Sequence, residues 1–333
     1  MTGPQREFIA LCDPEMRLPL PPGSLLARIS PQEICHWACF HGVHHFLLAN
    51  LQTPVRHAGY PPAWRAATVE LLSAVVRRDA ARTLLLRAEG QRILRALRSA
   101  GTGVLLLKGA DFADHLYPLP GLRSSTDIDL MVRERDFGRA GDMLESMGCR
   151  PVAEEGRKHA APYGEELFIL DTAGVTVRVE LHWNIVNSPS LRRALTLAYD
   201  DLVTEDGGLE NEGRLLIAAV HGGTGHQFDR LKFLVDLLQL FRRSGGKFDT
   251  TWLKERVRRT GTERVLSMAC WLVQTIFGES SPQLLLAELA LPYPSPLLRR
   301  LLGTGVLLAT LPRRTDRLRK MIFRHSLKRR GVR

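Results

Sequence analysis

Residues 126–132, Thr-Asp-Ile-Asp-Leu-Met-Val, decide the fold. Apolar residues at 128, 130 and 132 alternate with Asp127 and Asp129, which predicts a β-strand with one buried face. The two carboxylates lie on the opposite face, about 7 Å apart along the strand. Paired carboxylates suit Mg²⁺, which binds one or two of them together with phosphate oxygens of a substrate.

A second alternating stretch supplies a third acid. Over residues 175–182 one predicted face is Val, Val, Val and Leu, and the other carries Thr176, Arg178, Glu180 and His182. The turn at residues 171–174 makes this strand the return arm of a hairpin from residues 167–170, so that Glu180 can lie beside the Asp pair in one sheet. Three carboxylates on one face are costly unless cations neutralise them.

Helical patterns flank these strands. Apolar residues recur at helical intervals over residues 64–99, where Gly90 interrupts the pattern, and a helical pattern returns after residue 189. The sequence predicts an α+β fold with a mixed sheet between two helical blocks. The expected boundaries are 1–102 for the N-terminal helical block, 103–188 for the α/β core, 189–311 for the C-terminal helical block and 312–333 for a basic tail.

Charge is concentrated at the C-terminus. The 333 residues contain 46 Lys and Arg and 35 Asp and Glu, a formal net charge of +11. Ten of the basic residues and one Asp follow residue 311, so the tail alone carries +9. A cationic tail can contact a polyanion, and the alternative is a solvated amphipathic segment.

Cysteine usage and hydropathy indicate a cytoplasmic protein without a membrane span. The five cysteines are irregularly spaced in a chain that is too large to need disulfides. The most apolar stretch, residues 301–311, is about half of the roughly 20 residues that a bilayer requires. No basic segment followed by an apolar run begins the sequence.

Several motifs together carry a resemblance. They are Leu-Lys-Gly at 107–109, Arg-x-x-x-Asp-Ile-Asp-Leu at 123–130 and Glu-Leu-His-Trp at 180–183. Over about residues 104–240 the chain resembles the uncharacterised bacterial nucleotidyltransferase family of the DNA polymerase beta superfamily, and more distantly the abortive-infection-type nucleotidyltransferase toxins. The resemblance implies a minimal palm fold in which Asp127, Asp129 and Glu180 hold divalent metals, Mg²⁺ or Mn²⁺, beside an NTP.

The same resemblance suggests where the phosphates bind. Lys108, Gly109, Arg123 and Ser125 lie around the turn after the first predicted strand and just before the acidic strand. Many relatives have Gly-Ser at this turn, whereas this chain has Lys-Gly-Ala and a longer spacer to the first acid. Positive charge there would be aimed at phosphates at the start of the following helix.

A predicted helix after residue 230 offers further candidates. Lys232 and Asp236 share one face of it, and relatives often place a Lys and an Asp on such a helix near the nucleotide. The alternative is a solvated stripe in which the two residues pair with each other. His182 and His221 are weaker candidates, because such histidines are usually satisfied core residues.

These features predict a divalent-metal-dependent nucleotidyltransferase. It would transfer a nucleoside monophosphate from an NTP to an acceptor, either tRNA or another RNA, a protein or peptide, or a small metabolite, and release pyrophosphate. Two alternatives remain open: an inactive palm scaffold that binds RNA or an acidic partner through the tail, and a phosphotransferase on the same fold. No dinucleotide fingerprint, phosphate loop or nucleophile elbow occurs, which argues against dehydrogenases, ordinary kinases and hydrolases.

Overall fold

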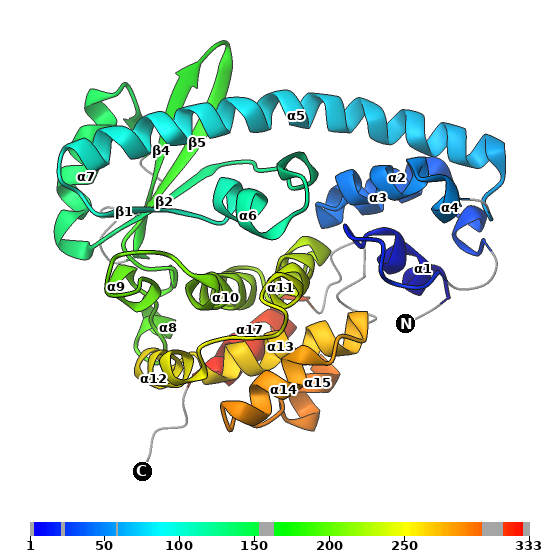
Figure 1. Ribbon diagram of the computed structural model, residues 1–333. Coiled ribbons are helices and arrows are strands. Elements are labelled where there is room, and N and C mark those ends of the chain that lie inside the picture. The colour runs from blue at the N-terminus through cyan, green and yellow to red at the C-terminus, as the bar shows by residue number, and fades with distance from the viewer. Residues whose placement is uncertain (1–2, 21–23, 58, 153–162, 302–315, 329–333) are drawn as a thin grey trace.

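The computed structural model describes residues 3–20, 24–57, 59–152, 163–301 and 316–328 (Figure 1). Its centre is a mixed five-stranded sheet with the strand order β1-β2-β5-β4-β3. The strands are β1 (Val104–Leu107), β2 (Ile128–Val132), β3 (Arg150–Pro151), β4 (Glu165–Thr172) and β5 (Val175–His182). The predicted α+β fold is confirmed, and a mixed sheet with helical flanks is consistent with the palm fold that the resemblance implies.

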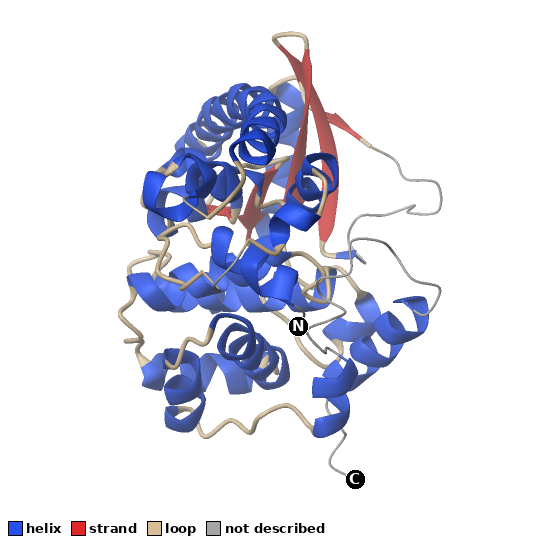
Figure 2. Ribbon diagram, turned by 90° about the vertical axis from the view of Figure 1, so that its right-hand side faces the viewer, coloured by secondary structure: helices blue, strands red, loops and turns tan. Residues whose placement is uncertain are grey.

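The alternating sequence patterns correspond to real strands. β4 and β5 form the predicted antiparallel hairpin, and β5 pairs in parallel with β2. Figure 2 shows this hairpin extending past the surrounding helices. Ile128, Leu130 and Val132 are all buried, at 3%, 0% and 0% exposure, as the pattern predicts. The two-residue strand β3 was not predicted.

The apolar face of the sheet packs against two helices. They are α5 (Pro62–Ser99), which runs across the sheet in Figure 1, and α7 (Phe137–Ser146). Leu86, Ile93 and Leu97 of α5 share a buried cluster with Leu130 and Leu144. The expected interruption at Gly90 is wrong: the helix continues through it, because glycine keeps the backbone N–H and C=O groups of a helix and lowers its stability by only about 1 kcal/mol.

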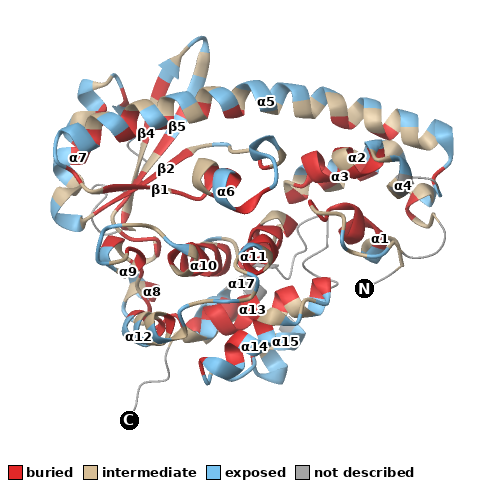
Figure 3. Ribbon diagram, in the orientation of Figure 1, coloured by how far each residue is buried: buried red, intermediate tan, exposed pale blue. Residues whose placement is uncertain are grey.

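The other face of the sheet, which carries the acids, is turned toward the remaining helices. Residues of the N-terminal and C-terminal blocks share one buried cluster with Leu105, Leu107 and Met131. Figure 3 shows that α10 and α11 are mostly buried, whereas α14 and α15 have exposed outer faces. The N-terminal helices are α1 (Gly3–Leu11), α2 (Pro31–His41), α3 (His44–Gln52) and α4 (Pro54–His57). Those after β1 are α6 (Gly109–Leu116), α8 (Pro189–Arg192), α9 (Tyr199–Leu202), α10 (Asn211–Val220), α11 (Leu231–Arg243), α12 (Thr250–Thr260), α13 (Glu263–Phe277), α14 (Ser281–Glu288), α15 (Pro296–Leu301) and α17 (Asp316–Leu327).

The C-terminal region is described in part. Residues 302–315 and 329–333 lie outside the described residues, and with them most of the apolar stretch at 301–311 and part of the basic tail. Within the tail, α17 is a helix whose Phe323 and Leu327 are buried. Arg264 donates hydrogen bonds to the carbonyls of Ser326 and Lys328 and so fixes its C-terminal end. Among the described residues, no helix is both long enough and apolar enough to span a membrane.

Candidate active site

Three neighbouring strands position the acidic residues. Asp129 on β2 is paired in register with Glu180 on β5 on one side and with Leu107 on β1 on the other. Because β2 and β5 are adjacent and parallel, residues at matched positions present their side chains on the same face. Asp127 comes directly before β2, and its carboxylate interacts electrostatically with Asp129 and Lys108. Asp129 and Glu180 therefore lie together, and Asp127 is near enough to interact with Asp129 through its charge.

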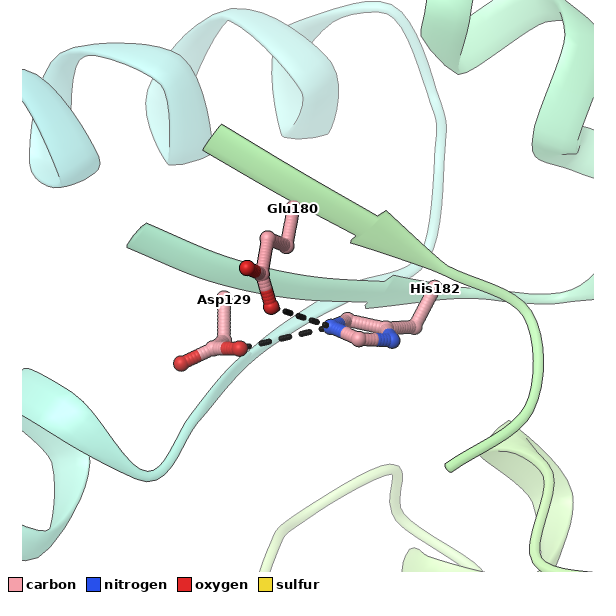
Figure 4. Close-up of side chains that lie close together, drawn as sticks. All are labelled: Asp129, Glu180 and His182. Carbon is pink, nitrogen blue, oxygen red and sulfur yellow. Dashed lines mark hydrogen bonds and ion pairs between the residues drawn. The ribbon is translucent and has the colours of Figure 1, made fainter. Parts of the chain in front are cut away.

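A histidine completes this group. Nε2 of His182 lies 3.3 Å from Oδ1 of Asp129 and 3.7 Å from Oε2 of Glu180 (Figure 4). The three residues each offer one ligand atom within 4.8 Å of the others, an arrangement able to hold a metal ion. In the described part of the chain this is the one cluster of three or more His, Cys, Asp or Glu residues with such spacing.

Lys108 reaches the acids from a sharp turn between β1 and α6. Its backbone has φ 46° and ψ −128°, a conformation that non-glycine residues rarely adopt, and Gly109 follows at φ 27°. Nζ lies 2.8 Å from Oδ1 of Asp129 and 3.1 Å from Nδ1 of His221. The turn therefore places the Lys108 ammonium group directly against the cluster of Asp129, Glu180 and His182.

The charges in the site perturb one another. Burial alone would raise the pKa of Asp129, but Lys108 and His182 hold it well below its usual range. Burial and the neighbouring Asp129 raise the pKa of Glu180 to about 7 and also raise that of Asp127. Burial disfavours the Lys108 ammonium, yet the charges of Asp129 and Asp127 raise its pKa above the ordinary value. The site is therefore short of positive charge and suited to a cation.

A buried network holds the turn in place. Arg123 donates from Nε and Nη2 to the two carboxylate oxygens of Asp236, at 2.7 and 2.9 Å. The Tyr117 hydroxyl donates to Oδ1 of the same carboxylate at 2.6 Å. Arg123 also donates from Nη1 to the carbonyl oxygen of Gly109 at 3.2 Å. The guanidinium thus ties α11 to the turn that presents Lys108.

Helix α11 also brings Lys232 close to the site. Burial first, and then the charge of Arg123, lower the pKa of Lys232, whose ammonium also interacts with Asp127. The alternative of a solvated Lys232 and Asp236 stripe is wrong, because Asp236 is 3% exposed and pairs with Arg123. The face of the helix that carries these polar residues is packed against α6 and its following turn rather than against water.

His221 contacts Lys108, and Ser125 contacts Gly109, at the same turn. Burial and the charge of Lys108 lower the pKa of His221 well below its usual value, so the imidazole is neutral beside the amine. Ser125 packs against Gly109, where an added Cβ would lie 3.2 Å from its Oγ. A small cavity beside α5 is lined by apolar residues such as Leu86 and Ile128 as well as by Gly109, Ser125, Asp127 and Asp129.

Two residues that were not among the predicted site residues take part. Oε2 of Glu165, on β4, lies 3.4 Å from Nδ1 of His182, and Tyr117 belongs to the Arg123 network. The register of the predicted hairpin contains the signal for Glu165, because it places this residue opposite His182. Nothing local in the sequence points to the partner of Tyr117, since Asp236 is far away along the chain.

The residues present fit a divalent metal. Carboxylate oxygens are suitable ligands for Mg²⁺ and Mn²⁺, and an imidazole nitrogen is available beside them. Lys108 and Lys232 add positive charge next to the acids, which is where an anionic ligand such as a triphosphate would be stabilised.

Comparison with protein families agrees with this geometry. Residues 27–278 match the family model described as uncharacterised nucleotidyltransferase, and this range contains every site residue named above. No curated protein and no solved structure matched the chain. With most of its length covered by that model, the chain belongs to the family of uncharacterised nucleotidyltransferases.

Proposed function

We propose that this protein is an active, metal-dependent nucleotidyltransferase that moves a nucleoside monophosphate from an NTP to an acceptor and releases pyrophosphate. One observation carries the proposal: Asp129 and Glu180 lie in register on adjacent strands with the Lys108 ammonium 2.8 Å from Asp129. Acids that share a face need a cation, and an amine beside them suits a polyphosphate. The family match supports the same class of reaction.

In the proposed site Asp127, Asp129 and Glu180 hold Mg²⁺ or Mn²⁺. Such an ion, when bound, neutralises charge that develops on the phosphate oxygens. Lys108 and Lys232 bind the phosphates, because their ammonium groups lie beside the acids that would hold the metal. Arg123, Tyr117 and Asp236 keep the Gly109 turn and Ser125 in position. The buried Arg123 guanidinium donates both to Asp236 and to the carbonyl oxygen of Gly109, and Tyr117 donates to the same Asp236 carboxylate.

Glu180 has a second role in the proposal. Burial and the charge of Asp129 raise the pKa of Glu180 to about 7. A carboxylate in that range can accept a proton from an acceptor hydroxyl. This supports Glu180 as a proton acceptor as well as a third metal ligand.

The acceptor belongs to one of three classes: tRNA or another RNA, a protein or peptide, or a small metabolite. The excess of Arg and Lys in the C-terminal tail favours a polyanionic acceptor. The proposed location is the cytoplasm, where NTPs are available.

Nucleotide binding tests the metal site first. Calorimetry with each NTP, with and without Mg²⁺ or Mn²⁺, should give metal-dependent binding that Asp129→Asn and Glu180→Gln reduce at least about tenfold. Glu180→Gln is included because Asp129 forms a buried ion pair that also supports the fold. Asp171→Asn is the matched control, since Asp171 lies on the same sheet at the exposed end of the hairpin.

The position of a radioactive label then separates the possible activities. Transfer of label from the α-phosphate to an acceptor, with release of pyrophosphate, supports the proposal. Transfer from the γ-phosphate with release of a nucleoside diphosphate would replace it with a phosphotransferase. Absence of metal-dependent nucleotide binding in the native protein would favour the inactive scaffold.

A further inference from the structure

We propose that His182 is a direct nitrogen ligand of the metal and that Glu165 positions it, so that the site prefers a first-row transition ion such as Mn²⁺ over Mg²⁺. This rests on the metal site of the proposed function and specifies its chemistry. The predicted ligand set contained three carboxylates, and the structure adds an imidazole to it.

The sheet register places four groups on one face. Asp129 is opposite Glu180, Met131 is opposite His182, and His182 is opposite Glu165 across the hairpin. Glu180 and His182 are two residues apart on β5 and so point the same way. The imidazole therefore lies between Glu165 on one side and the Asp129 and Glu180 pair on the other.

The distances match a shared ion. Two ligands that each lie about 2.2 Å from one ion are at most about 4.4 Å apart. Nε2 of His182 is 3.3 Å from Asp129 and 3.7 Å from Glu180, within that limit. His182 is only 4% exposed, so its ring is held there by packing rather than lying free at the surface.

Glu165 is placed to select the tautomer that a metal needs. A metal on Nε2 requires the proton on Nδ1. Oε2 of Glu165 lies at ion-pair distance, 3.4 Å, from that buried atom, which makes no hydrogen bond in this structure. The Asn187 side chain donates to the other oxygen, Oε1, at 3.1 Å and so holds the carboxylate in place. A carboxylate behind a metal-binding histidine orients the ring and strengthens the nitrogen ligand.

The ligand set determines which ion is preferred. Mg²⁺ is hard and is bound through oxygen, with several waters retained. Imidazole nitrogen suits transition metals, among which Mn²⁺ also accepts carboxylate oxygens. A site in which His182 joins the carboxylates of Asp129 and Glu180, with Asp127 beside them, therefore discriminates between Mn²⁺ and Mg²⁺ through the imidazole.

Pulsed electron paramagnetic resonance of Mn²⁺ bound to the full chain tests the assignment without nucleotide or activity. The native protein should show ¹⁴N coupling from a directly bound imidazole, and His182→Gln should abolish it and lower Mn²⁺ affinity by at least about tenfold, with a smaller change for Mg²⁺. Glu165→Gln should keep the coupling, with an altered strength, and weaken Mn²⁺ binding by about tenfold. His221→Gln, which removes the other imidazole beside Lys108, should keep the coupling unchanged.

The outcomes separate this proposal from the proposed function. Bound Mn²⁺ without ¹⁴N coupling, or coupling that persists in His182→Gln, overturns the ligand assignment even if nucleotidyl transfer is found. Coupling that depends on His182 in a protein that transfers no nucleotide supports the metal site and rejects the activity. Failure of the native protein to bind Mn²⁺ rejects the ligand assignment, and nucleotide binding with Mg²⁺ then tests the proposed function separately.

Discussion

Nζ of Lys108 and Oδ1 of Asp129 lie 2.8 Å apart, with only 9% and 3% of their side chains exposed. The pair joins the end of β1 to the middle of the adjacent strand, and Lys108 reaches it from a backbone conformation at φ 46°. Such a conformation costs about 1–3 kcal/mol in a residue other than glycine. The surrounding structure therefore stabilises a strained lysine, which places its amine among the acids.

Removal of the Lys108 amine should make the stability of the fold depend on a bound metal ion. Lys108→Met leaves the buried Asp129 carboxylate without its ammonium partner, so the free energy of unfolding should fall by about 3–5 kcal/mol. Excess Mn²⁺ should restore more stability to this variant than to the native protein, because the ion replaces the missing charge. Thermal unfolding with and without Mn²⁺ measures both effects. Lys247→Met, at an exposed lysine, is the control, and equal metal responses in all three proteins would contradict the prediction.

Backbone strain at the same position can be measured separately. Lys108→Gly and Lys108→Ala both remove the amine, but only glycine adopts φ 46° without a steric penalty. Lys108→Gly should therefore be more stable than Lys108→Ala by about 1–2 kcal/mol in urea unfolding. The usual order, in which glycine is the less stable because its unfolded chain is more flexible, would show that the turn relaxes in the variants.

Asp236 should be more important for stability than an ordinary helix residue. Asp236→Ala leaves the Arg123 guanidinium buried and unpaired and should lower the free energy of unfolding by about 3–5 kcal/mol. Tyr117→Phe removes one hydrogen bond and should cost only about 1 kcal/mol. Urea unfolding of both variants, and of Arg123→Met with Asp236→Leu together, provides the measurement. A double variant no better than Asp236→Ala would argue against an uncompensated charge as the cause.

The strands and the acidic face were predictable because their information is local. Alternation over residues 128–132 and 175–182 defines which side chains share a face, and the turn at residues 171–174 brings two strands together. Parallel pairing of β2 with β5 then puts Glu180 beside Asp129, as predicted. By contrast, β3 has two exposed residues, one of them proline, and carries no pattern.

The ionic partners were not predictable, because the information that pairs them is not local in the sequence. Arg123 and Asp236 are 113 residues apart, and only the packing of α11 against α6 brings them together. Polar residues spaced three and four apart on α11 predict a shared face, but whether that face meets water or protein depends on the tertiary fold. The assignment of nucleotide or phosphate contacts stays a prediction for all six candidates, Lys108, Gly109, Arg123, Ser125, Lys232 and Asp236.

A single methyl group in α5 should stabilise the protein. At Gly90 an added Cβ would lie 3.6 Å from Cγ2 of Ile128, an ordinary contact, and alanine favours the helix by about 1 kcal/mol. Gly90→Ala should therefore raise the melting temperature by about 2–4 °C. Gly223→Ala is the opposite case, because its Cβ would lie 2.2 Å from Cγ2 of Val265, and it should lower the melting temperature. Equal changes in melting temperature for the two variants would contradict the difference in space between Gly90 and Gly223.

Acid should destabilise the fold partly through His41. This residue is 1% exposed, and its Nδ1 accepts a hydrogen bond at 3.3 Å from the backbone N–H of Leu231, at the start of α11. Burial, and then the charge of Arg230, lower its pKa to about 4. Because the unfolded chain, with a pKa near 6.5, binds the proton more readily, stability from neutral His41 is complete above about pH 6.5. It is lost as the pH falls from there toward 4, by up to about 3 kcal/mol.

His41→Asn isolates this contribution. The amide oxygen of asparagine can accept the same hydrogen bond but does not titrate, so the variant should lose less stability between pH 7 and pH 4 than the native protein. Urea unfolding at pH 4, 5, 6 and 7 gives the difference between the two curves. Some dependence should remain in the variant, because burial also lowers the pKa of His45 to about 4. Parallel curves for the two proteins would show that His41 does not couple protonation to folding, and the acid sensitivity would then lie with His45 and the carboxylates.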